Sequence, residues 1–195
     1  MKKILITLIL FFTTFKLSLF LWINKIYYLE KFDQIYYSTL YSHSQYVLGP
    51  LSKYGIGDDG LYAYAGYYYL FQKGDVSNVN FEHPPLGKYL IGLSELIFKN
   101  ENTINILYFG ILLLLTYKIS LLLKHNKLLG VFSVLLLSSD KLFMDNLLRS
   151  LLDLPFTLFF VGAVYFFIKA LTRRKFFSTP VYFGGWLFRL DFFRL

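Results

Sequence analysis

The chain has 195 residues, of which 56% are hydrophobic and only 16% are charged, and its mean hydropathy is +0.49. This composition excludes a soluble globular domain and indicates a membrane protein. The absence of cysteine excludes a disulfide scaffold, a thiolate metal site and a cysteine nucleophile. The net charge of +8 would suit a nucleic-acid-binding protein, but in a membrane protein basic residues first report orientation, so no nucleic-acid partner is predicted.

Apolar runs long enough to cross the hydrocarbon core of a bilayer occupy residues 4–23, 104–123 and 154–171. A shorter run at 128–144 predicts a fourth span. We interpret the first run as an uncleaved signal anchor, because it contains Lys16 and lacks a small-residue cleavage site. The predicted fold is therefore all-α: a polytopic membrane helix bundle of about four spans.

The topology depends on residues 86–98, a run too short to cross the bilayer that contains Lys88 and Glu95. We expect this run to lie along the interface, so that residues 24–102 form a large outer loop of tyrosine-rich, amphipathic interfacial helices. The basic residues of the other turns then all face the cytoplasm: Lys2, Lys3, Lys124, Lys127 and residues 173–175. This distribution predicts an integral membrane protein of the plasma membrane, with a cytoplasmic N-terminus and the functional loops outside.

The domain organisation follows from the same pattern. Residues 1–172 are predicted to form one membrane module. Residues 173–195 are predicted to form a basic inner turn and a further span that is incomplete.

Two adjacent carboxylates, Asp58 and Asp59, stand between glycines at the predicted start of a tyrosine-rich helix. Adjacent residues at a helix start point in different directions, so one carboxylate can cap backbone N–H groups while the other faces a cleft. One interpretation makes both of them capping residues in a solvated turn. The other makes one of them a general base that accepts a proton from an attacking hydroxyl.

A second candidate is the string from Glu82 to Lys88, in which two prolines fix the backbone before a glycine. Such rigidity could aim His83 and Lys88 at one anionic ligand. Alternatively, the prolines merely start the interfacial helix, and Lys88 extends toward phospholipid headgroups. Both interpretations remain open at this point.

A third candidate lies at the mouth of the last span, where a spacing of four residues would put Arg149 and Asp153 on one helical face. The two side chains could simply pair with each other. An ionisable group that faces a membrane bundle is nevertheless a functional candidate by default. No metal site is predicted: a divalent metal is conceivable, but the scattered carboxylates lack a ligand spacing.

In this order, and on one side of the membrane, these strings resemble the superfamily of dolichyl-phosphate-mannose protein mannosyltransferases and aminoarabinose transferases. The resemblance covers about residues 1–172, and its most specific part is the His-Pro-Pro-Leu-Gly-Lys string after an acidic pair. The residues that carry it are Asp58-Asp59-Gly60, Tyr62-Ala63-Tyr64-Ala65-Gly66, Gly74-Asp75, Glu82 to Gly92, and Arg149 to Asp153 before Pro155-Phe156.

The resemblance implies a helical type-C glycosyltransferase fold with its active site on the outer face. The implied donor is a polyprenyl-phosphate sugar, with no other cofactor, and the implied acceptor is a hydroxyl of a protein, glycan or lipid. In that family the first acidic residue is implicated in catalysis, and the match falls on Asp58. The family usually has Asp-Glu where this chain has Asp58-Asp59. Substrate contacts are expected from five further residues: Asp59, His83, Lys88, Arg149 and Asp153.

Members of that superfamily generally have more spans than the four predicted here. The chain is therefore interpreted as a truncated or split form, with a second chain as a candidate supplier of the missing spans. The alternative is a non-catalytic scaffold or subunit derived from such an enzyme. A third hypothesis, a transporter, is suggested by Lys16 and Lys118 within apolar runs, but no repeated half is visible in the sequence.

Overall fold

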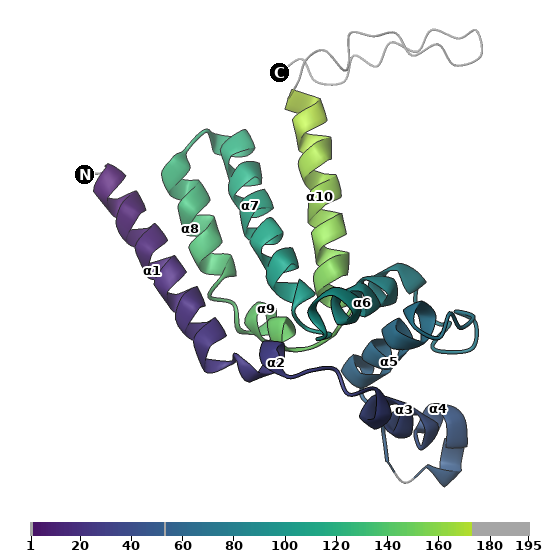
Figure 1. The fold of residues 1–195 in the computed structure, drawn as a ribbon. Coiled ribbons are helices and arrows are strands. Elements are labelled where there is room, and N and C mark those ends of the chain that lie inside the picture. The colour runs from purple at the N-terminus through teal and green to yellow at the C-terminus, as the bar shows by residue number, and fades with distance from the viewer. Residues whose placement is uncertain (1, 53, 173–195) are drawn as a thin grey trace, which may run out of the picture.

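The computed structural model describes residues 2–52 and 54–172, and these residues form helices joined by short turns (Figure 1). No strand occurs in this part of the chain, which confirms the predicted all-α class. The predicted inner turn and incomplete span at residues 173–195 lie outside the described residues. The α-helices are α1 (Lys2–Ile23), α2 (Ile26–Leu29), α3 (Gln34–Ser42), α4 (Gln45–Leu48), α5 (Asp58–Leu70), α6 (Pro85–Phe98), α7 (Ile104–Lys124), α8 (Lys127–Leu137), α9 (Lys141–Asp145) and α10 (Asp153–Thr172), and the 3-10 helices are η1 (Gly49–Leu51) and η2 (Asn146–Leu148).

Three of the described helices, α1, α7 and α10, are long and apolar enough to cross a membrane, at 22, 21 and 20 residues. At about 1.5 Å per residue each reaches roughly 30 Å, the thickness of the hydrocarbon core. Large apolar side chains are exposed on them, as Phe11 on α1 and Phe156 on α10 illustrate. These three spans were predicted from the sequence and are confirmed.

The fourth predicted span, at residues 128–144, is wrong in its length, because α8 ends at Leu137 after 11 residues. Asp140 then adopts an extended backbone, and its carboxylate accepts a hydrogen bond of 2.8 Å from the N–H of Phe143. This side chain caps the start of α9, so a new helix begins where the sequence pattern suggested continuation. By itself α8 reaches only about half of the hydrocarbon thickness.

Lys16 explains how the end of α8 is stabilised beside α1. Its ammonium group donates hydrogen bonds of 2.8 Å to the carbonyl oxygen of Ser138 and 2.9 Å to the hydroxyl of Ser139. A cation is favourable at a helix C-terminus, where carbonyl groups lack partners within the helix. The lysine in the middle of an apolar span therefore has a structural partner in the described part of the chain.

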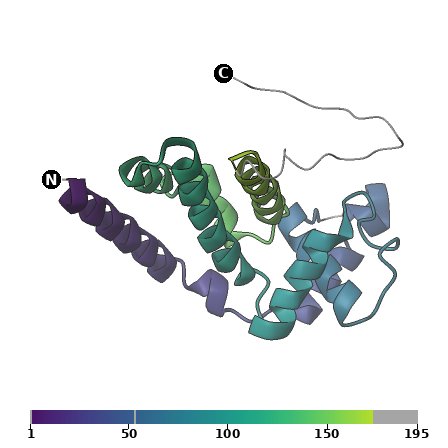
Figure 2. The ribbon, with the colours of Figure 1, turned by 90° about the horizontal axis from the view of Figure 1, so that it is seen from above.

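Neighbouring long helices stand in the order α1, α8, α7 and α10, and the short helices gather at one end of this row (Figures 1 and 2). At that end α6 runs across the bundle rather than beside the spanning helices (Figure 1). The opposite end carries the start of α1 and the turn between α7 and α8. The short helices between α1 and α7 therefore lie together at one end of the spanning helices (Figure 1).

The helices α5 and α6 cross with their backbones almost in contact. A Cβ atom added to Gly66 would lie 2.6 Å from the backbone nitrogen of Gly92 and 2.8 Å from the carbonyl oxygen of Lys88. Beside this crossing, Leu61 and Ile91 are buried in one apolar cluster. The crossing fixes the start of α5 relative to the start of α6, and both starts carry candidate residues.

Candidate functional site

The helix α5 begins with Asp58 and Asp59 in its first turn, where negative charge interacts favourably with the helix dipole. Its N-cap residue, Gly57, has no side chain that could cap the helix. Because adjacent helical residues project about 100° apart, the two carboxylates face different cavities. Asp58 lines a cavity between α5 and α10, which we call the Asp58 cavity, and Asp59 lines another, which we call the Asp59 cavity.

The Asp58 cavity has a volume of about 480 Å³ and is built from three segments that are far apart in the sequence. It brings together three of the predicted site residues, Asp58, His83 and Asp153. The lining residues are Asp58, Tyr62, His83, Pro84, Leu86, Gly87, Leu151, Leu152, Asp153, Pro155, Phe156 and Phe159.

The two walls of the Asp58 cavity differ in polarity. Asp58, His83 and Asp153 supply charged and polar groups, whereas Phe156 and Phe159 extend along α10. Both phenylalanines are exposed on this spanning helix. The apolar wall of the cavity is thus continuous with the surface that a membrane helix presents to lipid.

Tyr62 is a residue of this cavity that was not predicted as a site residue. Burial raises its pKa to about 12, and the charges of Asp58 and Asp153 contribute to the rise. The hydroxyl therefore keeps its proton near neutral pH and can donate a hydrogen bond. A spacing of four residues from Asp58, which places both residues on one face of α5, was the signal in the sequence that could have identified Tyr62.

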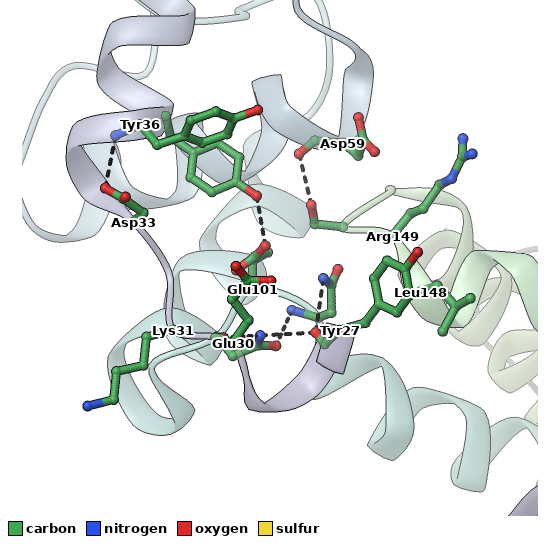
Figure 3. A pocket seen from close by; sticks show the side chains of 13 residues that line it. Tyr27, Glu30, Lys31, Asp33, Tyr36, Asp59, Glu101, Leu148 and Arg149 are labelled. Carbon is green, nitrogen blue, oxygen red and sulfur yellow. Dashed lines mark hydrogen bonds between the residues drawn. The ribbon is translucent and has the colours of Figure 1, made fainter. Parts of the chain in front are cut away.

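The Asp59 cavity has a volume of about 440 Å³ and is lined by Asp59 from the start of α5 (Figure 3). Arg149 lines this cavity and not the Asp58 cavity. The hydroxyl of Ser150 donates a hydrogen bond of 2.8 Å to the carbonyl oxygen of Asp59, which joins the segment before α10 to α5. The lining residues are Tyr27, Glu30, Lys31, Asp33, Tyr36, Tyr37, Asp59, Asn100, Glu101, Asn102, Leu148, Arg149 and Ser150.

The prediction that Arg149 and Asp153 share one helical face is wrong. Arg149 has an extended backbone, with φ −130° and ψ 143°, and α10 begins only at Asp153. An acidic residue at the first position and Pro155 two residues later are both typical of a helix start. The two residues consequently line different cavities.

Lys88 also differs from the expectation that it shares one ligand with His83. Its side chain is fully buried, and its ammonium group donates hydrogen bonds to the carbonyl oxygen of Asn80 and, at 2.9 Å, to the side-chain oxygen of the same residue. Burial lowers the pKa of Lys88, and the charge of Glu82 opposes this effect. Lys88 lines neither of the two cavities, and it fastens the loop before α6 to the helix itself.

We predict that Lys88→Met leaves the oxygens of Asn80 without a partner, at a cost of about 1–3 kcal/mol. The loop that contains Lys73 should then open, and trypsin should cleave after Lys73 faster than in the unmodified chain. Lys141→Met, which removes an exposed lysine, is the matched control and should not change this rate. If cleavage after Lys73 is unchanged but the variant no longer binds substrate, Lys88 contacts the substrate directly instead.

Glu95 on α6 is buried, and neither of its carboxyl oxygens has a hydrogen-bond partner among the described residues. Burial raises its pKa from 4.5 to about 9, and the charge of Glu101 adds to the rise. At pH 7 the folded chain therefore holds a proton that the unfolded chain releases. Its stability should fall by about 1.4 kcal/mol per pH unit as the pH rises between these two pKa values.

We predict that Glu95→Gln, which is neutral at every pH, removes this contribution. Thermal unfolding followed by circular dichroism between about pH 5 and pH 8 should show a smaller decline of the midpoint than in the unmodified chain. Glu82→Gln, a change at an exposed side chain, is the control and should keep the original decline. Equal declines in all three proteins would show that Glu95 is charged in the folded state.

A family model described as dolichyl-phosphate-mannose-protein mannosyltransferase matches residues 82–188. The match includes His83, Lys88, Arg149 and Asp153, whereas Asp58 precedes it. The comparisons with curated proteins and with solved structures find no match. The matched residues make up more than half of the chain, and the described residues include three helices long and apolar enough to cross a membrane. The chain therefore belongs to the dolichyl-phosphate-mannose-protein mannosyltransferase family of membrane glycosyltransferases.

Proposed function

We propose that the chain transfers a sugar from a polyprenyl-phosphate donor to an acceptor hydroxyl on the outer face of the membrane. The observation that carries the proposal is the Asp58 cavity. It gathers Asp58, His83 and Asp153 and continues into the apolar surface of α10. A donor with a phosphate at the end of a long apolar chain matches a cavity with one polar and one apolar wall.

In the proposed mechanism Asp58 is the general base. Its carboxylate accepts the proton of the acceptor hydroxyl while the hydroxyl oxygen attacks the anomeric carbon of the sugar. The bond between that carbon and the phosphate oxygen breaks, and the lipid phosphate leaves with the electron pair. Hydrogen-bond donors near the phosphate stabilise the charge that develops on it.

The side chains of His83 and Tyr62 can donate hydrogen bonds, and both line the same cavity as Asp58. Of the expected substrate contacts His83, Lys88 and Arg149, His83 is the one that lines this cavity, whereas Arg149 lines the Asp59 cavity and Lys88 lines neither. We assign the phosphate to His83 and Tyr62, and the orientation of the acceptor to Asp153. Both assignments rest on position within the cavity.

The proposed orientation follows from charge. The end of the bundle opposite the cavities carries Lys2, Lys3, Lys124 and Lys127 (Figure 1). Basic residues near span ends favour the cytoplasmic side, so we place this end in the cytoplasm and both cavities outside the plasma membrane.

The experiment that tests the proposal uses the full chain in lipid nanodiscs and two radiolabelled donors, a polyprenyl-phosphate sugar and a nucleotide sugar. We expect label to reach an acceptor from the lipid-linked donor and not from the nucleotide sugar. The assay is run with the chain alone and with any membrane protein encoded beside it, because a second chain is the proposed supplier of further spans. The absence of transfer under both conditions would contradict the proposal and favour the scaffold hypothesis.

A further inference from the structure

The Asp59 cavity is separate from the proposed catalytic cavity and is built at the end of the helix bundle. It lies between the segment after α1, the turn from α6 to α7, and the segment that precedes α10 (Figure 3). Glu30 from the segment after α1, Asp59 from the start of α5 and Glu101 from the turn between α6 and α7 line it with their carboxylates, together with Asp33, the N-cap residue of α3. We propose that this cavity binds a protonated primary amine.

Several hydrogen-bond donors of the cavity wall are already engaged. The hydroxyl of Tyr37 donates to Glu101 at 2.8 Å, and the hydroxyl of Ser150 donates to the backbone of Asp59. The side-chain nitrogen atoms of Asn100 and Asn102 donate to the carbonyl oxygen of Tyr27, at 3.0 and 3.4 Å. The carboxylates of the wall only accept hydrogen bonds, so a ligand that pairs with them must bring its own N–H or O–H donors.

One acceptor in the wall has no partner at all within the described residues. Asn102 is 7% exposed, and its side-chain oxygen is buried without a hydrogen bond. An unpaired buried acceptor of this kind costs about 1–3 kcal/mol, and a ligand donor that reached this oxygen from the cavity would recover that cost. This observation is independent of the carboxylates and points to a ligand with donors.

Among ligands that carry such donors, the negative charge of the carboxylates in the cavity favours a cation. Burial and the charges of Glu30 and Asp59 raise the pKa of Glu101. The cationic side chains in the wall, Lys31 and Arg149, do not neutralise the repulsion between Glu101 and these two carboxylates. In Figure 3 the ammonium group of Lys31 points away from the cavity, and the guanidinium group of Arg149 points away from Glu101.

The wall suits an ammonium group better than a metal ion. Although several carboxylates line the cavity, no three Asp, Glu, His or Cys side chains in the described part of the chain are placed closely enough to hold a metal ion. Aromatic rings from Tyr27, Tyr36 and Tyr37 line the same cavity, and ring faces attract organic cations. An ammonium group also offers three N–H donors to carboxylate and amide oxygens.

A protonated primary amine could reach this end of the bundle from two sources: the ethanolamine headgroup of a phospholipid, or a soluble amine. The test therefore uses the full chain in nanodiscs of phosphatidylcholine, with ethanolamine as the probe and ethylene glycol as its neutral analogue. Binding is measured by saturation-transfer NMR in the absence of any sugar donor, so the result does not depend on the proposed transfer reaction.

We expect ethanolamine to bind and ethylene glycol to bind at least about tenfold more weakly. Glu101→Gln should weaken ethanolamine binding by a similar factor, and Asp59→Asn provides a second variant if the first fails to fold. Asp75→Asn, a change at an exposed carboxylate outside the cavity, is the control and should bind normally.

Nanodiscs that contain phosphatidylethanolamine distinguish the two sources. Weaker ethanolamine binding in these discs would identify the headgroup as the occupant, and equal binding would identify a soluble amine, so both results support the site. No ethanolamine binding in phosphatidylcholine, or equal binding of ethanolamine and ethylene glycol, would overturn the inference.

Discussion

Replacing Asp58 by asparagine should lower the rate of sugar transfer by a factor of about 10²–10⁴, the usual contribution of a general base. Asparagine keeps the size of the side chain but does not accept the proton of the acceptor hydroxyl. Asp58 is exposed at the mouth of its cavity, so the change should leave the fold intact. The measurement is transfer from a radiolabelled polyprenyl-phosphate sugar at saturating donor.

The control for this prediction is Asp75→Asn in the loop after α5. Asp75 is exposed, and its carboxylate accepts hydrogen bonds from the backbone and hydroxyl of Ser77. It lines neither the Asp58 cavity nor the Asp59 cavity, so its replacement should leave transfer unchanged. If the Asp58 variant retains full transfer, another group removes the proton and the assignment of the base is wrong.

The spanning helices could be predicted from the sequence because crossing a bilayer imposes a length and an apolar composition on each of them. The same constraint predicted that residues 86–98 do not span, and α6 runs across the end of the bundle (Figure 1). From the predicted outer segment, Asp58 and Asp153 were expected on one side. Their common cavity agrees with that expectation.

The local errors arose where the helical backbone is interrupted within a pattern that suggested one continuous helix. Asp140 interrupts the fourth apolar run by capping α9, and its effect depends on backbone geometry that hydropathy does not report. The spacing between Arg149 and Asp153 suggested one helix, but the intervening residues are not helical. Spacing within a string predicts a shared face only where the helix is continuous.

The partners of buried charges were not predictable from the sequence either. Lys88 and Asn80 are close in sequence, yet their contact requires the loop between them to fold back onto α6. The cavity around Glu101 depends on a turn that meets the segment after α1, and no motif marks this meeting. Such contacts are set by how the helices pack, and the most restrictive packing in this chain is the crossing of α5 and α6.

Gly66→Ala should disrupt the crossing of α5 and α6 and lower the stability of the folded chain. The added methyl group would lie 2.6 Å from the backbone nitrogen of Gly92, and neither backbone can rotate away as a side chain could. Overpacking of this kind typically costs about 1–3 kcal/mol. The unfolding midpoint, followed by circular dichroism in detergent, should fall accordingly.

The matched control is Gly110→Ala on α7, because a Cβ atom there would meet no atom within 4 Å. Alanine is a better helix former than glycine by up to about 1 kcal/mol, so this variant should be neutral or slightly more stable.

The same comparison tests the geometry of the site. The helix α5 carries Asp58 and the segment that starts α6 carries His83, so separating the two helices in the Gly66 variant should widen the Asp58 cavity and reduce transfer. A Gly66 variant with normal stability would show that the two backbones do not cross at this glycine.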